Sequence, residues 1–230
     1  MCESLGAYGV TQHGGFADKS VVKASAVHSI GDMKFEVAAL AEPLGCALNG
    51  LEAAQSSRAE SAMIFGAGPI GMLLALGLKA GGNKDVTLVD IDETRLEIAE
   101  SFGFHTVPAE SAQLKSLHQS VDLVADATGV PAVAGKLTNY IANGGVGLFF
   151  GVCPSDARIE ISPFELFRRQ LTLAGSHSLN HNIPQALSTL KAIGDDITRL
   201  VSHQLSTEDV AGIFNGKAPT GSLKIQSILS

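Results

Sequence analysis

From residue 61 onward, short apolar runs alternate with longer stretches whose apolar residues recur at helical spacing. The short runs are typical of strands, and the longer periodic stretches are typical of amphipathic helices. The pattern predicts strands at 62–65, 86–89, 104–107, 121–125, 146–150 and 171–174. It predicts helices at 70–79, 92–102, 112–118 and 132–141, the last ending near Asn143, Gly144 and Gly145. Strands that alternate with helices form βαβ units, so we expect an α/β fold with a doubly wound parallel sheet.

The two ends of the chain do not continue this alternation. Residues 1–40 hold glycine-rich turns and short β-like pieces such as 19–22. The other end predicts helices at 184–193 and 207–214, the second capped by Ser206, and strands at 200–204 and 223–228. We therefore divide the chain into 1–43, 44–177 and 178–230, with the alternating core in the middle.

Composition and charge remove several classes of partner. The formal net charge is −7 and no block of Lys or Arg stands out, which argues against nucleic acid and anionic membranes. The stretch 61–78 lacks charge, but its glycines interrupt it, so we do not expect it to span a membrane. No secretory leader is visible at the start, and the three cysteines (Cys2, Cys46 and Cys153) are scattered. The chain is therefore expected in the cytoplasm.

The turn Gly66-Ala67-Gly68-Pro69-Ile70-Gly71 follows the first predicted strand directly and opens the first predicted helix. In this context Gly66 permits a tight turn, Gly68 lets the backbone approach a pyrophosphate, and Gly71 lets helix and strand pack closely. The helix start then offers free N–H groups to phosphates. The turn predicts a Rossmann domain that binds a nicotinamide dinucleotide.

Asp90 ends the second predicted strand, about twenty residues beyond the glycines. A carboxylate there can accept both ribose hydroxyls of adenosine and would repel a 2′-phosphate, which favours NAD over NADP. Arg95 follows five residues later and leaves the NADP alternative open, because an arginine can pair with the extra phosphate. Asp92 is expected to cap its helix rather than to bind ligand.

The fourth and fifth predicted strands end in small residues. Thr128 lies in Asp126-Ala127-Thr128-Gly129, and Gly151 follows Phe149-Phe150. Ligands in open α/β sheets bind at the carboxyl ends of strands, so Thr128 and Gly151 are expected to line the nicotinamide pocket. The alternative is that these residues only shape the loops.

Several pieces of the chain together resemble the medium-chain, zinc-type alcohol and polyol dehydrogenases. They are Gly14-Gly15-Phe16-Ala17, Ala41-Glu42-Pro43-Leu44, the glycine turn, Asp126-Ala127-Thr128-Gly129, Ser162 to Ser176, and Gly216 to Ile225. Glu42-Pro43-Leu44 resembles the sorbitol and threonine dehydrogenase branch, in which this glutamate approaches the catalytic zinc or its water. The resemblance also implies a basic residue near the cofactor phosphates at Lys224. It implies that 1–43 and 178–230 are parts of a β-rich, GroES-like catalytic domain.

One departure from the family limits what the resemblance implies. Cys2-Glu3-Ser4-Leu5 resembles the fourth cysteine of the family's structural zinc lobe, and the segment that supplies the other zinc ligands is not in this sequence. A catalytic zinc needs about three protein ligands, and Glu42 is the one candidate left. We expect no catalytic zinc on this chain alone, a buried apolar role for Cys46, and loop positions for His177 and His181.

The sequence thus predicts an NAD-dependent oxidoreductase that moves hydride between a secondary alcohol, such as a sugar alcohol, and nicotinamide. The zinc would polarise the substrate oxygen in a complete enzyme. Two alternatives stay open: a catalytically silent dinucleotide-binding chain, and a zinc-independent reductase of the same superfamily. The expected partners are a small alcohol or polyol and, by analogy with the family, a second copy of the chain.

Overall fold

Six parallel strands form the central sheet in the order β3-β2-β1-β4-β5-β6 of the computed structural model, which describes residues 6–216 and 218–228. The strands are β1 (Ser61–Phe65), β2 (Asp85–Asp90), β3 (His105–Pro108), β4 (Val121–Asp126), β5 (Ile141–Phe149) and β6 (Thr172–Gly175). β1 pairs with β2 on one side and with β4 on the other. The chain therefore reverses its winding direction between β1 and β4, which is where doubly wound sheets bind their ligands.

Each face of the sheet has its own hydrophobic core, because successive strand residues point to opposite faces. In β1, Ala62 and Ile64 join the core beneath the helices on one face, and Met63 and Phe65 join the core on the other. The first face carries α2 (Ala41–Ala53), α3 (Pro69–Ala80), α4 (Glu93–Ser101) and α8 (Ile183–Ile193). The second carries α5 (Ala112–Ser116) and the 3₁₀ turn η3 (Leu137–Asn139). The predicted doubly wound α/β fold is confirmed.

The predicted helix at 132–141 is wrong. The structure has the short α6 (Pro131–Ala134), then η3, and β5 already begins at Ile141. Pairing in the sheet conflicts with the end of this helix, because Ile141 pairs with Val121 of β4 and the chain is extended there. The buried guanidinium of Arg169, at the end of α7 (Pro163–Arg169), donates to the carbonyl oxygens of Thr138 and Ile141 and so satisfies two backbone acceptors of this segment.

Gly144 and Gly145, the expected stop signal of this helix, do not end a helix. Both glycines lie inside β5, where the pairing with β4 shifts register between Val121 and Leu123. Gly144 has a φ of 81°, and a Cβ on Gly145 would lie 2.7 Å from the carbonyl oxygen of Asp122. These two glycines therefore lie in an irregular part of β5 and not at a helix end.

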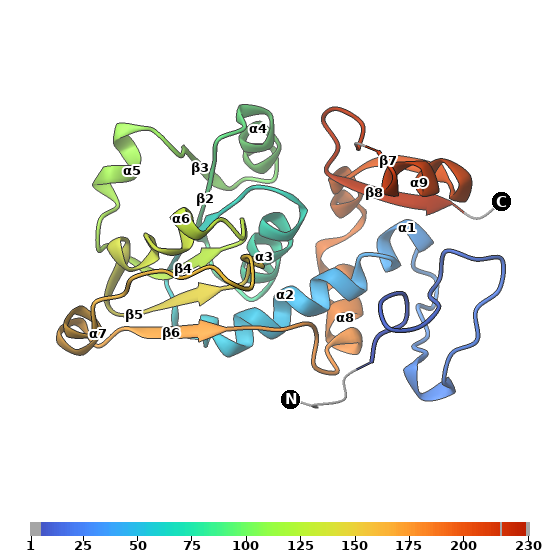
Figure 1. Ribbon diagram of the computed structural model, residues 1–230, viewed down its shortest axis with the longest axis horizontal. Coiled ribbons are helices and arrows are strands. Elements are labelled where there is room, and N and C mark those ends of the chain that lie inside the picture. Colours follow the sequence, from blue (N-terminus) through green and yellow to red (C-terminus); the bar gives the residue numbers. More distant parts are fainter. Residues whose placement is uncertain (1–5, 217, 229–230) are drawn as a thin grey trace.

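The segments before and after the sheet lie together on one side of the molecule (Figure 1). β7 (Val201–Ser206) and β8 (Lys224–Ile228) form a separate two-stranded parallel sheet against α9 (Thr207–Phe214), which starts at the predicted Ser206 cap. The remaining elements are η1 (Ala24–Ala26), α1 (Phe35–Ala38), η2 (Ser56–Arg58) and η4 (Asp195–Leu200). Contacts such as the edge-to-face pair Phe16–Phe214, with ring centroids 5.8 Å apart, join the two ends of the chain.

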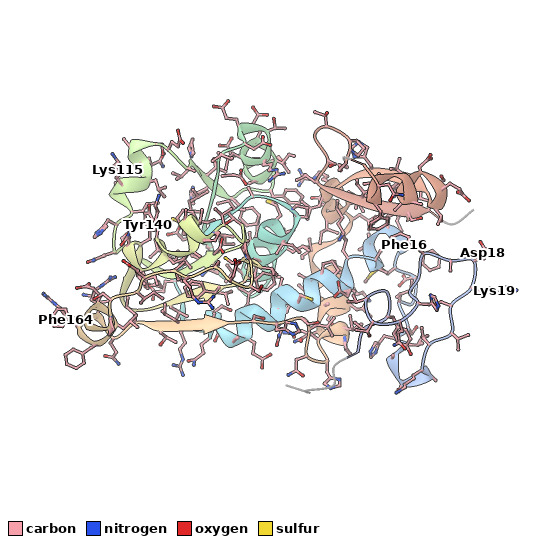
Figure 2. All side chains as sticks on the ribbon, viewed as in Figure 1. Phe16, Asp18, Lys19, Lys115, Tyr140 and Phe164 are labelled. Atoms are coloured by element: carbon pink, nitrogen blue, oxygen red, sulfur yellow. The ribbon has the colours of Figure 1, made fainter. Side chains whose placement is uncertain are left out.

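The β-like piece expected at 19–22 is not a strand. No neighbouring strand among the described residues offers it a hydrogen-bond ladder, and a strand needs such a partner. Large apolar side chains stay exposed along this part of the chain and also on α7, where Figure 2 shows Phe164 pointing outward. Among the helices described, none is long and apolar enough to cross a bilayer.

Candidate dinucleotide site

The glycine turn joins β1 to α3 at the carboxyl edge of the sheet. Gly66 has a φ of 101°, a conformation that favours glycine, and its N–H donates to Val89 at 2.7 Å. A Cβ on Gly71 would collide with the carbonyl oxygen of Gly66. The geometry therefore demands glycine at both positions, as expected for a turn that packs a helix tightly against a strand.

α3 starts directly at this turn. Gly68 is the residue before the helix, Pro69 takes the first helical position, and no described side chain caps the end. Ile70 is half-buried and packs against the first core. The first backbone N–H groups lack intrahelical partners and carry the positive end of the helix dipole, which suits an anion such as a phosphate.

Asp90 ends β2 beside the turn, and only 8% of its surface is exposed. Its Oδ2 accepts from the N–H of Ala67 at 2.7 Å, and its Oδ1 accepts from the N–H of Asp92 at 3.0 Å. The carboxylate is thus fixed to the backbone on both sides. Each oxygen keeps a second lone pair, which leaves acceptor capacity for a ligand hydroxyl.

Arg95, on the first turn of α4, approaches the same place. Its Nη1 lies 4.0 Å from Asp90 Oδ2, and its Nε lies 3.6 Å from Asp92 Oδ2. Asp92 caps α4 as predicted, with its side chain accepting from the backbone N–H groups of Thr94 and Arg95. The pairing of Asp92 with Arg95 was not predicted, although their spacing of three residues on a helix permits it.

Thr128 and Gly151 come together at the ends of β4 and β5. Thr128 donates through its N–H and its hydroxyl to Asp126 Oδ1, at 2.8 and 2.6 Å, and packs against Gly66. Gly151 donates to the carbonyl of Asp126 at 2.7 Å, and a Cβ there would collide with Gly129. The loops expected to line the pocket therefore meet beside the glycine turn.

Asp126 organises this meeting point and was missing from the predicted site residues. Its side chain is fully buried, and Oδ2 has no hydrogen-bond partner among the described residues. The sequence signal was the Asp-x-Thr-Gly run, in which the Asp side chain bonds the backbone two residues on. A buried carboxylate with a free oxygen and a cradle that excludes side chains both fit a polar ligand at this edge.

Lys224, Glu42 and Cys46 lie outside this cluster. Lys224 begins β8 in the second sheet, opposite Val201, so its role near phosphates stays a prediction. Glu42 is exposed on α2, and its Oε1 accepts from the Cys46 thiol at 3.4 Å. Cys46 is half-buried, so its expected place in the apolar core is wrong. Burial and the neighbouring Glu42 raise the pKa of its thiol to about 12.

These residues do not fit a catalytic zinc. In the part of the chain that the structure describes, no three His, Cys, Asp or Glu side chains converge as metal ligands. His177 and His181 lie in the loop between β6 and α8, as expected, and share no helix face. The expected zinc-lobe remnant, Cys2-Glu3-Ser4-Leu5, lies outside the described residues.

Two cavities lie at the opposite, amino-terminal edge of the sheet. One of about 420 Å³ is lined by residues that include Ser56, Glu60 and Lys84, and one of about 180 Å³ is lined by residues that include Arg58 and Asn143. Neither contains the glycine turn or Asp90. Because the fixed carboxylate and the helix start gather at the carboxyl edge, we place the candidate site there and not in the cavities.

The chain is similar in sequence to proteins that are named dehydrogenases. The sequence model of a family described as zinc-binding dehydrogenase matches residues 69–192. The D-altritol 5-dehydrogenase of Agrobacterium fabrum is 49% identical over 231 residues, covering 98% of this chain and 69% of that protein. D-arabinitol dehydrogenase 1 of Uromyces fabae is 31% identical, covering 98% of this chain and 67% of that protein.

Solved structures agree with the fold. A zinc-binding dehydrogenase from Sinorhizobium meliloti, bound to NADP, superposes with a TM-score of 0.93 at 25% identity, over 100% of this chain and 70% of its own. The 2R,3R-butanediol dehydrogenase from Bacillus subtilis gives a TM-score of 0.86 at 24% identity, over 97% of this chain and 67% of its own. The chain thus spans about two thirds of the proteins it resembles, including their parallel sheet.

Proposed function

We propose a function from one premise: this chain belongs to the zinc-binding dehydrogenases, a family of oxidoreductases. The chain holds a nicotinamide dinucleotide, with NAD preferred, at the carboxyl edge of its sheet. It serves hydride transfer between the cofactor and a secondary alcohol of a sugar alcohol or similar polyol. The division into 1–43, 44–177 and 178–230 stands with this proposal, with the middle part as the cofactor-binding unit.

The observation that carries the proposal is the bond between Ala67 N–H and Asp90 Oδ2, 2.7 Å long. It joins the phosphate-binding turn to the carboxylate that would take the adenosine ribose. Gly66, Gly68 and Gly71 keep the turn free of side chains, and the start of α3 offers N–H groups to the pyrophosphate. Local geometry and charge therefore favour a dinucleotide over a simple phosphate, which would need no ribose acceptor.

Each residue has a stated role in this arrangement. Asp90 would accept from the ribose hydroxyls, and Thr128 and Gly151 would shape the floor beneath the nicotinamide half of the cofactor. When bound, the nicotinamide supplies the acceptor or donor of hydride. Because the described residues do not assemble a zinc site, Glu42 stays a metal candidate only.

The substrate class follows from the relatives. The two relatives described above are named for the sugar alcohols D-altritol and D-arabinitol, which supports a polyol substrate. A catalytically silent dinucleotide-binding chain is the second candidate. It is favoured by the surroundings of Glu42, which is exposed and accepts a hydrogen bond from the Cys46 thiol. The pKa of that thiol is raised to about 12, so it is not the thiolate that a metal needs as a ligand. Cofactor binding is common to both candidates, and turnover separates them.

The binding experiment uses the fluorescence of NADH, which is read cleanly because the chain contains no Trp. We expect saturable binding by the wild-type chain and loss of binding by Gly71→Ala, since the added Cβ collides with Gly66. Gly212→Ala is the matched control, because nothing lies within 4 Å of a Cβ there. Circular dichroism checks that each variant keeps its helices. Equal binding by the wild type and Gly71→Ala would contradict the site.

The turnover experiment follows NADH formation from D-altritol and D-arabinitol, with and without added zinc, and measures the metal content of the chain. Turnover supports the dehydrogenase proposal. Binding of NADH without any turnover supports the catalytically silent alternative. Turnover that is unchanged after complete removal of metal supports the zinc-independent reductase.

Two further features of the proposal concern place and assembly. The described cysteines, Cys46 and Cys153, are both free thiols, which supports a reducing cytoplasm.

β6 is an edge strand of the large sheet, and an unpaired edge can pair with a second copy. Light scattering on the purified chain tests this assembly: a monomeric mass at micromolar concentration would contradict it.

A further inference from the structure

Asp92 performs two separable tasks at the edge of the proposed site. Its Oδ1 accepts from the backbone N–H groups of Thr94 and Arg95, at 3.0 and 3.4 Å, and so caps α4. Its Oδ2 faces the Arg95 side chain, 3.6 Å from Nε. Asparagine caps helices about as well as aspartate, so the charge of Asp92 can be removed while the cap is kept.

Arg95 is consequently held by carboxylates on two sides. Asp90 approaches Nη1 at 4.0 Å, and Asp92 approaches Nε. Nη1 also lies 3.7 Å from the place that a Cβ on Gly68 would take, so the guanidinium lies against the phosphate-binding turn. The Arg95 side chain is 41% exposed, which leaves it accessible to a ligand.

We propose that Asp92 makes this site prefer NAD over NADP by holding Arg95, an inference that rests on the proposed function. One guanidinium between two carboxylates leaves a net negative charge at the place where NADP would bring a 2′-phosphate. Like charges at short range oppose binding. The cation that would otherwise pair with the phosphate is engaged by Asp92. NAD carries hydroxyls there, which Asp90 can accept, and so avoids the penalty.

The role of Asp92 differs from that of Asp90. Asp90 is buried and bonded to Ala67, so it contributes to the turn as well as to the ribose site. Asp92 is about half exposed, and its side chain accepts hydrogen bonds from the backbone of α4. Asp92 therefore acts on the cofactor through Arg95 and is a positioning residue for specificity.

The test measures dissociation constants of NADH and NADPH by fluorescence titration. For Asp92→Asn we expect NADPH to bind about three- to fivefold more tightly, the range of a half-exposed charge interaction. NADH affinity should change by less than about twofold, because its ribose acceptor is untouched. Glu93→Gln is the matched control: it removes the same charge from the adjacent residue, which makes no ion pair among the described residues.

The double variant Asp92→Asn/Arg95→Gln shows whether the gain passes through Arg95. The NADPH gain should disappear in it, because the freed guanidinium is what binds the phosphate. The gain should also shrink as salt is raised from about 0.05 to 0.5 M, as screening requires. A merely structural effect of Asp92 would follow neither pattern, and thermal unfolding checks that the helix cap is intact.

The outcomes separate the two proposals. If the wild-type chain binds neither NADH nor NADPH, the proposed function fails and this inference fails with it. If the wild type binds NADH and Asp92→Asn leaves the NADPH-to-NADH ratio unchanged, the inference is overturned and the proposed function stands. The inference also fails if Glu93→Gln shifts the ratio as much as Asp92→Asn, or if the double variant keeps the gain.

Discussion

The two edges of the same six-stranded sheet are built very differently. At the carboxyl edge, backbone turns, two buried carboxylates and a helix start converge within one or two residues of the strand ends. At the amino edge lie the two cavities, together with exposed side chains such as Lys84. The cavities at the amino edge therefore do not mark the site. The site is marked by fixed polar groups that point to a common place, because a ligand binds more tightly to groups that are already ordered.

The core beneath both edges gives the largest expected effect. Leu123, in the middle of β4, is 1% exposed, and Leu123→Ala should lower the free energy of unfolding by about 3 kcal/mol. Chemical denaturation measures the loss. Because Leu123 packs in the core and is not one of the proposed site residues, NADH affinity measured well below the unfolding midpoint should be unchanged. A large drop in NADH affinity with little loss of unfolding free energy would contradict this prediction, because it would show that Leu123 acts on the site and not on the core.

Two aspartates on the same strand sharpen the comparison directly. Asp122, at the amino edge, accepts from the N–H groups of Glu60 and Ser61, and Asp126, at the carboxyl edge, accepts from Thr128. Each loses its bonds on replacement by alanine, and each variant should lose about 2 kcal/mol of stability. Only Asp126→Ala should weaken NADH binding, by about tenfold, since a 1.4 kcal/mol disturbance of the site suffices for that.

Denaturation and NADH titration of both variants check this pair. A common loss of affinity would mean that stability, and not the local geometry of the Asp126–Thr128 loop, governs binding. A loss of NADH affinity confined to Asp122→Ala would place the site at the amino edge and contradict the account.

The smallest effect is expected at the larger cavity. Lys84 is exposed on its rim, and Lys84→Ala should change stability by no more than about 0.5 kcal/mol, as for most surface positions. NADH affinity should stay within about twofold, although lysine is an obvious partner for a phosphate. Titration at low salt, where such a contact would be strongest, checks it. A clear loss of affinity would indicate that the cofactor uses the amino edge.

Local features of the sequence predicted the carboxyl edge well. The turn and the cap at Asp92 depend on residues within a few positions of each other, so their spacing determines their geometry. The approach of Asp90 to Ala67 follows once β1 and β2 are known to be parallel neighbours. The pairing of Arg95 with two carboxylates was not predicted, because it depends on side-chain direction as well as on spacing.

The failures in secondary structure share a long-range cause. The segment 132–141 has a helical pattern, but Ile141 pairs with Val121 of β4, so the chain is extended where the predicted helix would end. The piece at 19–22 has strand-like residues but no neighbouring strand among the described residues. Cys46 has apolar neighbours in sequence, yet the helix turns its thiol toward Glu42 and partly toward solvent. Pattern predicts an element, and tertiary partners decide whether it forms.

Hydrogen–deuterium exchange with and without NAD tests the central claim, that the cofactor binds at the carboxyl edge, most directly. We predict slower exchange in peptides that cover 66–72, 90–96, 126–130 and 150–152, because bound phosphates and ribose would shield or order those amides. Peptides that cover 56–60, 82–85 and 143–145, which line the amino-edge cavities, should not change. Protection of the second set without the first would contradict the account.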